Sequence, residues 1–258
     1  MFCTKFLNII REYELDFFKN NLDRNSRILE IGGGTGIQAK LLSEAGFNIE
    51  SIDLKDSTYS EDRVYPVVDY DGTTIPFDEN EFDTVFSSNV LEHIKDIDSF
   101  QKEIIRVLKP GGQCVHAMPT GAWRFWTNCA SYIELVQRII LLIPDGIPTS
   151  LSLSNPRYFM SNLYGLLRAY KVPPRHGEEG NAFTEIYLFS KRKWVKHFKE
   201  NNFNVKAVSS MGLFYTGHMV LGSRMPLQLR KKLSSVLGSA CVLYTVIPKT
   251  KDIKNEES

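Results

Sequence analysis

Apolar residues along the chain follow two patterns: short continuous runs, and stripes that repeat every three or four residues. Apolar residues three or four positions apart predict an amphipathic helix over residues 4–21. Five short apolar runs predict buried strands. They cover residues 28–31, 48–53, 64–68, 82–87 and 113–118. Helical stripes separate the first two runs and the last two, and Asp96 or Asp98 is placed to cap the second of these helices. The first half of the chain is therefore predicted to be an α/β unit.

The second half departs from this pattern after Met118. Residues 119–183 are too many for a simple connection and are rich in aromatic side chains. Two helical pieces are predicted within them, at about 125–143 and 156–169. A helix over Lys191–Glu200 and strands over 203–209 and 241–247 then return to the pattern of the first half, and 249–258 is predicted to be disordered. We expect a single domain, 1–258, with a core of residues 22–118 and 186–248 and a helical lid or substrate-binding insertion over 119–185.

The stretch RILEIGGGTG joins the first strand to a helix through three glycines, Gly32, Gly34 and Gly36. Glycine lets the backbone approach a ligand where a Cβ would collide. A dinucleotide-binding turn needs its third glycine at position 37, which is Ile37, so an NAD-dependent enzyme is disfavoured. The pattern is instead acidic-x-G-x-G-x-G, beginning at Glu30. A carboxylate at that position suits a ligand with a cationic amino group better than a pyrophosphate.

Four further motifs follow the glycine turn in order. Asp53 ends the second strand, 17 residues after Gly36, where an acidic residue accepts hydrogen bonds from ribose hydroxyls in nucleotide-binding units. The motifs DYDGTTIPF, FDTVFSSNVLEH and LKPGG come next. Together they resemble the class I S-adenosylmethionine (SAM) methyltransferases of the type 11 family, over residues 27–118. The resemblance implies a Rossmann-like fold with a seven-stranded, mostly parallel sheet flanked by helices, one antiparallel edge strand, and SAM as cofactor.

By matching position, the resemblance also implies the cofactor contacts. Glu30 would face the amino end of SAM, the three glycines would line its methionine and ribose portion, and Asp53 would hold the ribose diol. Beside the adenine the resemblance implies Leu54, Asp69 and Tyr70, and near the transferring methyl group Ser88 and Asn89.

Two histidines are candidates for a general base, which a hydroxyl acceptor needs. His176 lies in the polar, glycine-flanked stretch PRHGEEGNAFTE among aromatic residues, where Glu178 or Glu179 could orient its ring. His93 follows the fourth strand, near the expected methyl group. Each can equally be a structural or solvated histidine. His116, expected inside a strand, His197, expected on a surface helix, and His218 are not proposed as catalytic.

Composition and charge restrict the classes of binding partner that we expect for this chain. The formal net charge of +1 gives no electrostatic case for nucleic acid, and the four scattered cysteines predict no metal site and a cytoplasmic setting. We expect no signal peptide, because charged residues lie among the apolar residues of the N-terminal stretch. We expect no transmembrane segment, because the longest apolar run, Ile139–Ile143, is too short. Peripheral membrane contact by the 133–143 helix is an alternative to packing in the core or lid. The basic clusters at 191–193 and 230–232 could meet phosphate-bearing or lipid-linked substrates, or be solvated faces.

The function that these features predict is transfer of a methyl group from SAM to a small-molecule or sugar acceptor. We expect O-methylation in the biosynthesis of surface polysaccharides or secondary metabolites. A SAM-binding scaffold or regulator without catalysis is the alternative, and turnover of SAM separates the two. Fold and cofactor motif do not fix the acceptor or the oligomeric state.

Overall fold

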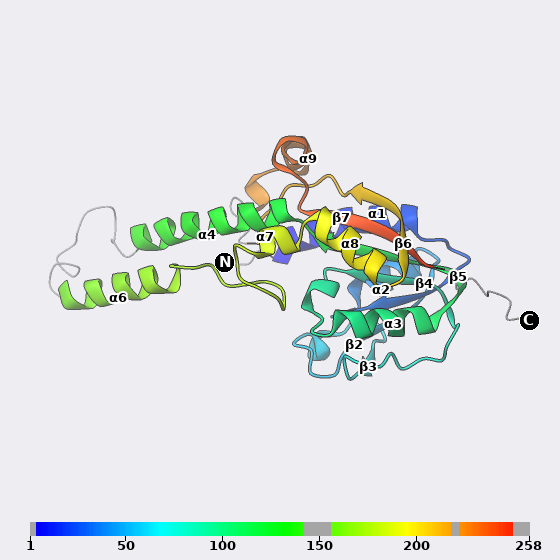
Figure 1. Ribbon diagram of the computed structural model, residues 1–258. Coiled ribbons are helices and arrows are strands. Elements are labelled where there is room, and N and C mark those ends of the chain that lie inside the picture. Colours follow the sequence, from blue (N-terminus) through cyan, green and yellow to red (C-terminus); the bar gives the residue numbers. More distant parts are fainter. Residues whose placement is uncertain (1–3, 142–155, 218–221, 250–258) are drawn as a thin grey trace, which may run out of the picture. The chain divides into compact units, whose positions relative to one another are not determined.

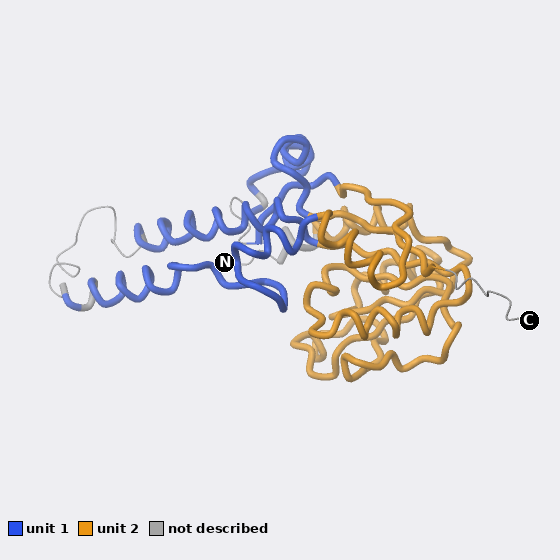
Figure 2. Tube along the Cα trace, viewed as in Figure 1, with its two compact units in different colours: residues 1–6, 119–190, 212–240 blue, residues 7–118, 191–211, 241–258 orange. Residues whose placement is uncertain are grey.

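In the computed structural model, residues 4–141, 156–217 and 222–249 are described, and the chain forms two compact units (Figures 1 and 2). Unit 2 contains residues 7–118, 191–211 and 241–258, and unit 1 contains residues 1–6, 119–190 and 212–240. Every strand of the described chain belongs to unit 2, except for the last residue of one of them.

The core of unit 2 is one seven-stranded sheet, as predicted. Its strands are β1 (Arg27–Ile31), β2 (Asn48–Leu54), β3 (Val68–Tyr70), β4 (Phe82–Ser88), β5 (Leu108–Pro119), β6 (Phe203–Ser210) and β7 (Cys241–Pro248). They are ordered β3-β2-β1-β4-β5-β7-β6. The pairs β1–β2, β1–β4, β2–β3 and β4–β5 are parallel, whereas the edge strand β6 pairs antiparallel with β7.

Helices cover both faces of this sheet, because successive side chains of a strand point to opposite faces. On β4, Val85 joins the hydrophobic cluster that also holds Phe100 and Phe198, from the helices α3 (Ile97–Val107) and α8 (Lys191–Glu200). The next residue, Phe86, packs edge-on against Phe18, with ring centroids 4.5 Å apart. Phe18 lies on α1 (Thr4–Asn21), so α1 covers the face opposite α3.

Short elements complete unit 2. The helix α2 (Ile37–Glu44) follows the glycine turn, and the 3₁₀ helices are η1 (Ser60–Asp62) and η2 (Leu91–His93). Asp96 is the cap of α3, because its side chain accepts a hydrogen bond from the Ser99 N–H at 3.1 Å. This settles the choice between Asp96 and Asp98.

Two strand boundaries differ from the sequence-based expectation. The third strand is not Val64–Val68, because only Val68–Tyr70 pair with β2. The fifth strand begins at Leu108 rather than at Gln113: Phe82 pairs with Leu108 and Thr84 already with Gln113. The residues between these two pairs, including Gly111 at φ +83°, form an irregularity within β5 instead of a turn before it.

Unit 1 is helical in its described part. It contains α4 (Gly121–Leu141), α6 (Pro156–Ala169), α7 (Glu185–Leu188), η4 (Gly222–Arg224) and α9 (Leu227–Leu237). The helices α4 and α6 confirm the two helices predicted after the fifth strand, whereas α9 was not predicted. The predicted turn at 144–155 and the tail at 250–258 lie outside the described residues. No helix among the described residues is long and apolar enough to cross a membrane.

Candidate functional site

The carboxyl ends of four neighbouring parallel strands bring the predicted cofactor residues to one edge of the sheet. The strands β3, β2, β1 and β4 are adjacent and run in the same direction. Their ends therefore meet at the same edge, where open α/β sheets bind ligands. The residues at this edge are Glu30, Gly32, Gly34 and Gly36 after or near the end of β1, Asp53 and Leu54 of β2, Asp69 and Tyr70 of β3, and Ser88 and Asn89 at the end of β4.

Glu30 carries the most strongly perturbed carboxyl group at this edge. Its side chain is buried and accepts a hydrogen bond from the Ser51 hydroxyl at 2.7 Å. The pKa of Glu30 is raised to about 7, mainly by burial; the bond from Ser51 opposes the rise, and the negative charge of Asp53 adds to it. The positive charge of Arg11, on α1, lowers it. A second positive charge brought to Glu30 would therefore be stabilised by an ionised carboxylate.

Two positions of the glycine turn, Gly32 and Gly36, combine a positive φ with no room for a Cβ. Gly32 has φ +74°, and a Cβ at this position would collide with the side chain of Val90. Gly36 has φ +76°, and a Cβ there would lie 2.8 Å from the Cβ of Tyr65. The turn is held close to β2, because the N–H groups of Gly32 and its neighbour both donate to the carbonyl of Ile52. Backbone rather than side chain is thus presented at this point.

The acidic residues that end β2 and β3 are in different environments. Asp53 and Asp69 are paired in register, but the Asp69 carboxylate forms an ion pair with Arg63 at 2.8 Å. The Asp53 carboxylate accepts the N–H of Leu54, whose side chain is exposed. Tyr70 is half-buried, and burial, with the charge of Asp53, raises its pKa to about 12. The ribose contact of Asp53 and the adenine contacts of its neighbours stay predictions. At Asp69 the ion pair with Arg63 would compete with a bond to the adenine.

Two residues near the end of β4 were not identified from the sequence. Arg11 donates to the Ser88 hydroxyl at 3.4 Å and pairs with Glu14 of α1 at 2.7 Å. The Cys241 thiol, at the start of β7, donates to the Asn89 side-chain oxygen at 3.4 Å. The only signal for Arg11 was its place on the amphipathic helix predicted over residues 4–21, and Cys241 had none. Both contacts connect distant parts of the chain to the candidate methyl end of the site.

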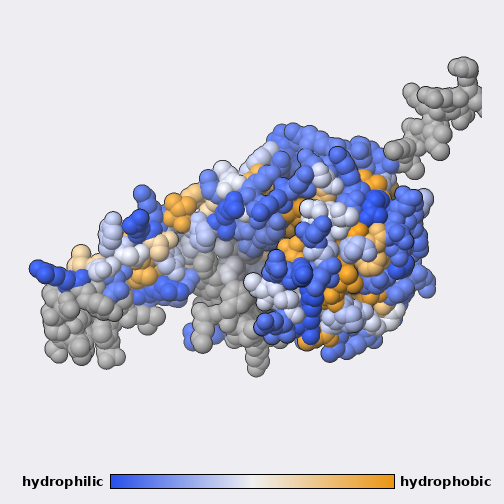
Figure 3. Space-filling model, turned by 90° about the horizontal axis from the view of Figure 1, so that it is seen from below, coloured by the Kyte–Doolittle hydropathy of each residue, from blue (hydrophilic) through white to orange (hydrophobic). Residues whose placement is uncertain are grey.

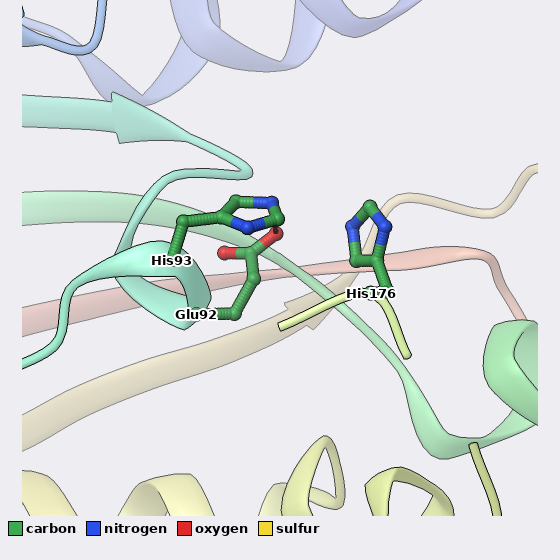
Figure 4. Close-up of side chains that lie close together, drawn as sticks. All are labelled: Glu92, His93 and His176. Atoms are coloured by element: carbon green, nitrogen blue, oxygen red, sulfur yellow. Dashed lines mark ion pairs between the residues drawn. The ribbon is translucent and has the colours of Figure 1, made fainter. Parts of the chain in front are cut away.

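His93 lies on η2, directly after β4. Its Nε2 is 3.7 Å from a carboxylate oxygen of Glu92, whose side chain is buried (Figure 4). His93 itself is about two-fifths exposed, so a solvent-accessible imidazole stands beside a buried carboxylate. This combination is suited to general-base chemistry. His176, also drawn in Figure 4, belongs to unit 1.

In unit 1 a buried ion pair holds the loop that carries His176. The Glu185 side chain accepts the backbone N–H groups of His176 and Gly177, at 2.7 and 2.8 Å. Its other oxygen is 2.8 Å from the Arg124 Nε, and both side chains are buried. The imidazole packs edge-on against Trp123, with centroids 4.7 Å apart. Glu185 thus fixes the backbone that carries the His176 imidazole, and Trp123 packs against the ring itself.

Glu185, rather than Glu178 or Glu179, is the carboxylate that holds the His176 loop in the structure. Glu178 interacts with Arg175, whose side chain donates to the Glu178 carbonyl at 2.7 Å. In the sequence Glu185 is only the last residue of the polar stretch PRHGEEGNAFTE. Its partners lie nine residues before it in the loop and on α4, separations that a local pattern does not reveal.

The other histidines fit structural roles where they are described. His116 is on β5 as predicted, fully buried, and burial lowers its pKa to about 3. His197 is on α8, but it is buried against Trp194 and not on the surface as expected. His218 lies outside the described residues.

The donor set at the edge of the sheet fits SAM. A buried carboxyl with a raised pKa suits the amino group, backbone without side chains at the glycine turn allows close approach, and Asp53 is placed for a hydroxyl pair. Glu30, Asp53 and the turn would hold the cofactor, and Ser88 and Asn89 would lie near its reacting end. When bound, SAM supplies an electrophilic methyl group on a sulfonium.

Known proteins resemble this chain in sequence over part of its length. A family described as "Methyltransferase domain", of type 11, matches residues 29–116. A ubiquinone biosynthesis O-methyltransferase from Bradyrhizobium diazoefficiens is 30% identical over 143 residues, covering 53% of this chain and 55% of the relative. A demethylmenaquinone methyltransferase from Clavibacter sepedonicus is 36% identical over 101 residues, covering 34% and 39%. The chain thus spans about half or less of the length of these relatives.

The fold extends the likeness to nearly the whole chain. A solved structure of a SAM-dependent methyltransferase from Aquifex aeolicus has a TM-score of 0.51 with 12% identity, covering 95% of this chain and 98% of the other. That likeness shows the fold, and the sequence match covers the glycine turn and the four motifs that follow it. Residues 29–116 are thus similar to the type 11 methyltransferase domain, and the chain has the fold of SAM-dependent methyltransferases.

Proposed function

We propose that this chain transfers the methyl group of SAM to a hydroxyl of a small-molecule acceptor. The observation that carries the proposal is the convergence of Glu30, the glycine turn and Asp53 at the carboxyl edge of β1 and β2, within the residues that match the family. Glu30 binds the cationic amino end and Asp53 the ribose hydroxyls. These contacts fix the cofactor so that the acceptor oxygen, the methyl carbon and the sulfur can become collinear.

The proposal assigns the insertion 119–185 to the acceptor. Trp123 and Phe189 flank His176 with their rings, and flat aromatic surfaces suit the apolar face of a sugar or an aromatic ring. Sugar precursors of surface polysaccharides and secondary metabolites are one acceptor class to test. Ring hydroxyls of quinone precursors are a second class, because relatives are named for ubiquinone and menaquinone biosynthesis.

His176 is the first choice as general base. As the bond from the acceptor oxygen to the methyl carbon forms and the bond from sulfur to carbon breaks, the hydroxyl proton passes to the imidazole. Glu185 fixes the backbone on which this imidazole is carried. His93, beside the buried Glu92, is the second choice.

The cofactor assignment is tested by calorimetric titration. The protein is expected to bind SAM and S-adenosylhomocysteine, and not NAD. Asp53→Ala should weaken SAM binding roughly fivefold or more, because each hydrogen bond contributes about 1 kcal/mol and more when charged. Glu44→Gln, at the exposed end of α2, is the control and should bind like the parent. Binding of NAD without SAM would refute the methyltransferase proposal, and an unchanged affinity of Asp53→Ala would remove Asp53 from the site.

The base is tested by turnover at matched SAM occupancy. Removing a true base costs roughly 100-fold or more in rate while SAM affinity stays unchanged. His176→Ala and His93→Ala are compared, with transfer of a deuterated methyl group to candidate acceptors followed by mass spectrometry. If both variants stay within a few-fold of the parent, neither residue is the base and positioning carries the rate. Absence of transfer to any acceptor, with SAM bound, would favour the scaffold alternative.

A further inference from the structure

The two units differ in charge although the whole chain is nearly neutral. The chain has 31 basic and 30 acidic residues, and unit 1 takes eleven of the basic and five of the acidic ones. Unit 2 is left with 20 basic and 25 acidic residues. Unit 1 is therefore the cationic part of the molecule.

The helix α4 presents a continuous apolar stripe to solvent. Phe125, Tyr132, Val136 and Ile140 are all exposed, and their spacing of seven, four and four residues places them on one side of the helix. The opposite side carries the one acidic residue of α4, Glu134, which is paired with Arg138 at 2.8 Å. The stripe thus carries no negative charge of its own helix.

The neighbouring helix α6 repeats this arrangement. It contacts α4, and its exposed apolar residues are Met160, Tyr164 and Leu167, which share one side. Arg157 and Arg168 are exposed at the border of that side, and the sequence of α6 contains no acidic residue. We call α4 and α6 together the hairpin. In the space-filling view, apolar and hydrophilic residues alternate on its surface (Figure 3). The hairpin therefore combines apolar stripes with basic residues.

Apolar stripes bordered by basic residues favour one kind of partner, a lipid surface. Basic residues beside a stripe with aromatic and aliphatic side chains are typical of helices that lie in the interface of a lipid bilayer. Negatively charged lipid headgroups attract Lys and Arg at the surface. A second copy of the chain would instead bring two cationic hairpins together, and like charges repel. We propose that the hairpin of α4 and α6 binds peripherally to anionic lipid membranes.

Sedimentation of the full chain with lipid vesicles tests this inference. Vesicles contain phosphatidylcholine with or without about one-third phosphatidylglycerol, at ~0.1 M salt where charge attraction is retained. Binding is expected only to the anionic vesicles. Arg157→Gln/Arg168→Gln should lower the partition coefficient by roughly 25-fold, about fivefold for each charge. Val136→Ser/Ile140→Ser/Tyr164→Ser should lower it by roughly 100-fold, because three apolar side chains no longer enter the interface.

A matched control removes two exposed charges from the start of α8, in unit 2. Lys191→Gln/Arg192→Gln should bind vesicles within about twofold of the parent, since the proposal places no lipid contact on α8. Circular dichroism checks that each variant is folded, and the exposed arginine pair still decides the matter if the apolar variant does not fold. Failure of the parent to bind anionic vesicles, or equal binding by all variants, overturns the proposal. So does a dimer in sedimentation equilibrium that only the apolar variant dissociates.

Discussion

Burial of Glu30 predicts that the protein without cofactor loses stability as the pH rises. The pKa of this carboxyl is about 7 in the folded chain and 4.5 in its ordinary state. The folded state therefore binds the proton more tightly, and its stabilisation is complete below pH 4.5 and lost as the pH rises through 7. The pKa difference corresponds to roughly 3 kcal/mol of unfolding free energy.

The substitution Glu30→Gln removes this dependence while keeping a group that the Ser51 hydroxyl can contact. Near pH 4.5 the variant and the parent should have similar stability, because Glu30 is then mostly protonated. Above pH 8 the variant should be more stable by up to about 3 kcal/mol, since no buried negative charge remains. Urea-induced unfolding between pH 4.5 and 9, without cofactor, measures the difference.

Two controls make the result specific to Glu30. Glu44→Gln, on the exposed surface of α2, should show the pH dependence of the parent. Carboxyl-carbon chemical shifts in nuclear magnetic resonance report the titration of Glu30 directly and should give a midpoint near 7. A midpoint near 4.5, or a Glu30→Gln variant less stable than the parent at pH 8.5, would refute the reasoning.

Two further predictions concern backbone geometry and the buried ion pair. Gly32→Ala should lower the free energy of unfolding by roughly 1–3 kcal/mol and weaken SAM binding, because φ is +74° and Val90 occupies the space of the new methyl group. Urea-induced unfolding measures the change, and an unchanged unfolding curve would contradict the prediction. Glu185→Gln should lower the stability of unit 1 by about 3 kcal/mol, since it leaves Arg124 charged and buried without its partner. Thermal unfolding followed by tryptophan fluorescence measures it, with Glu179→Gln as the exposed control, and equal midpoints would count against the ion pair.

The parts of the fold that depend on local pattern could be predicted from the sequence. β1 and β4 are buried in the middle of a parallel sheet, so they appear as short apolar runs, and their predicted ends are within one residue of the structure. The glycine turn was predictable for the same reason, because its spacing is contained within seven residues. The direction of the strands then determines the edge of the sheet at which the candidate cofactor-binding residues lie.

The parts that depend on distant contacts were not predictable. The third strand was misplaced because Val64 is apolar but does not pair with β2. The helix α9 was missed, and its Arg230, interpreted as one of a solvated or phosphate-binding cluster, is buried. Its guanidinium donates to backbone carbonyls of Phe214, Gly222 and Met225. A buried arginine with carbonyl partners has the same sequence signature as an exposed one.

The position of β7 has a consequence for how the chain folds during synthesis. This strand lies between β5 and β6, yet it follows every other strand of the sheet in the sequence. Until residues 241–248 emerge, a nascent chain exposes the unpaired edge of β5, which is long and mostly buried in the finished sheet. Open strand edges of this kind are templates for aggregation. A chain that stops before β7 should therefore depend on chaperones, although every residue of the candidate cofactor site has already been made.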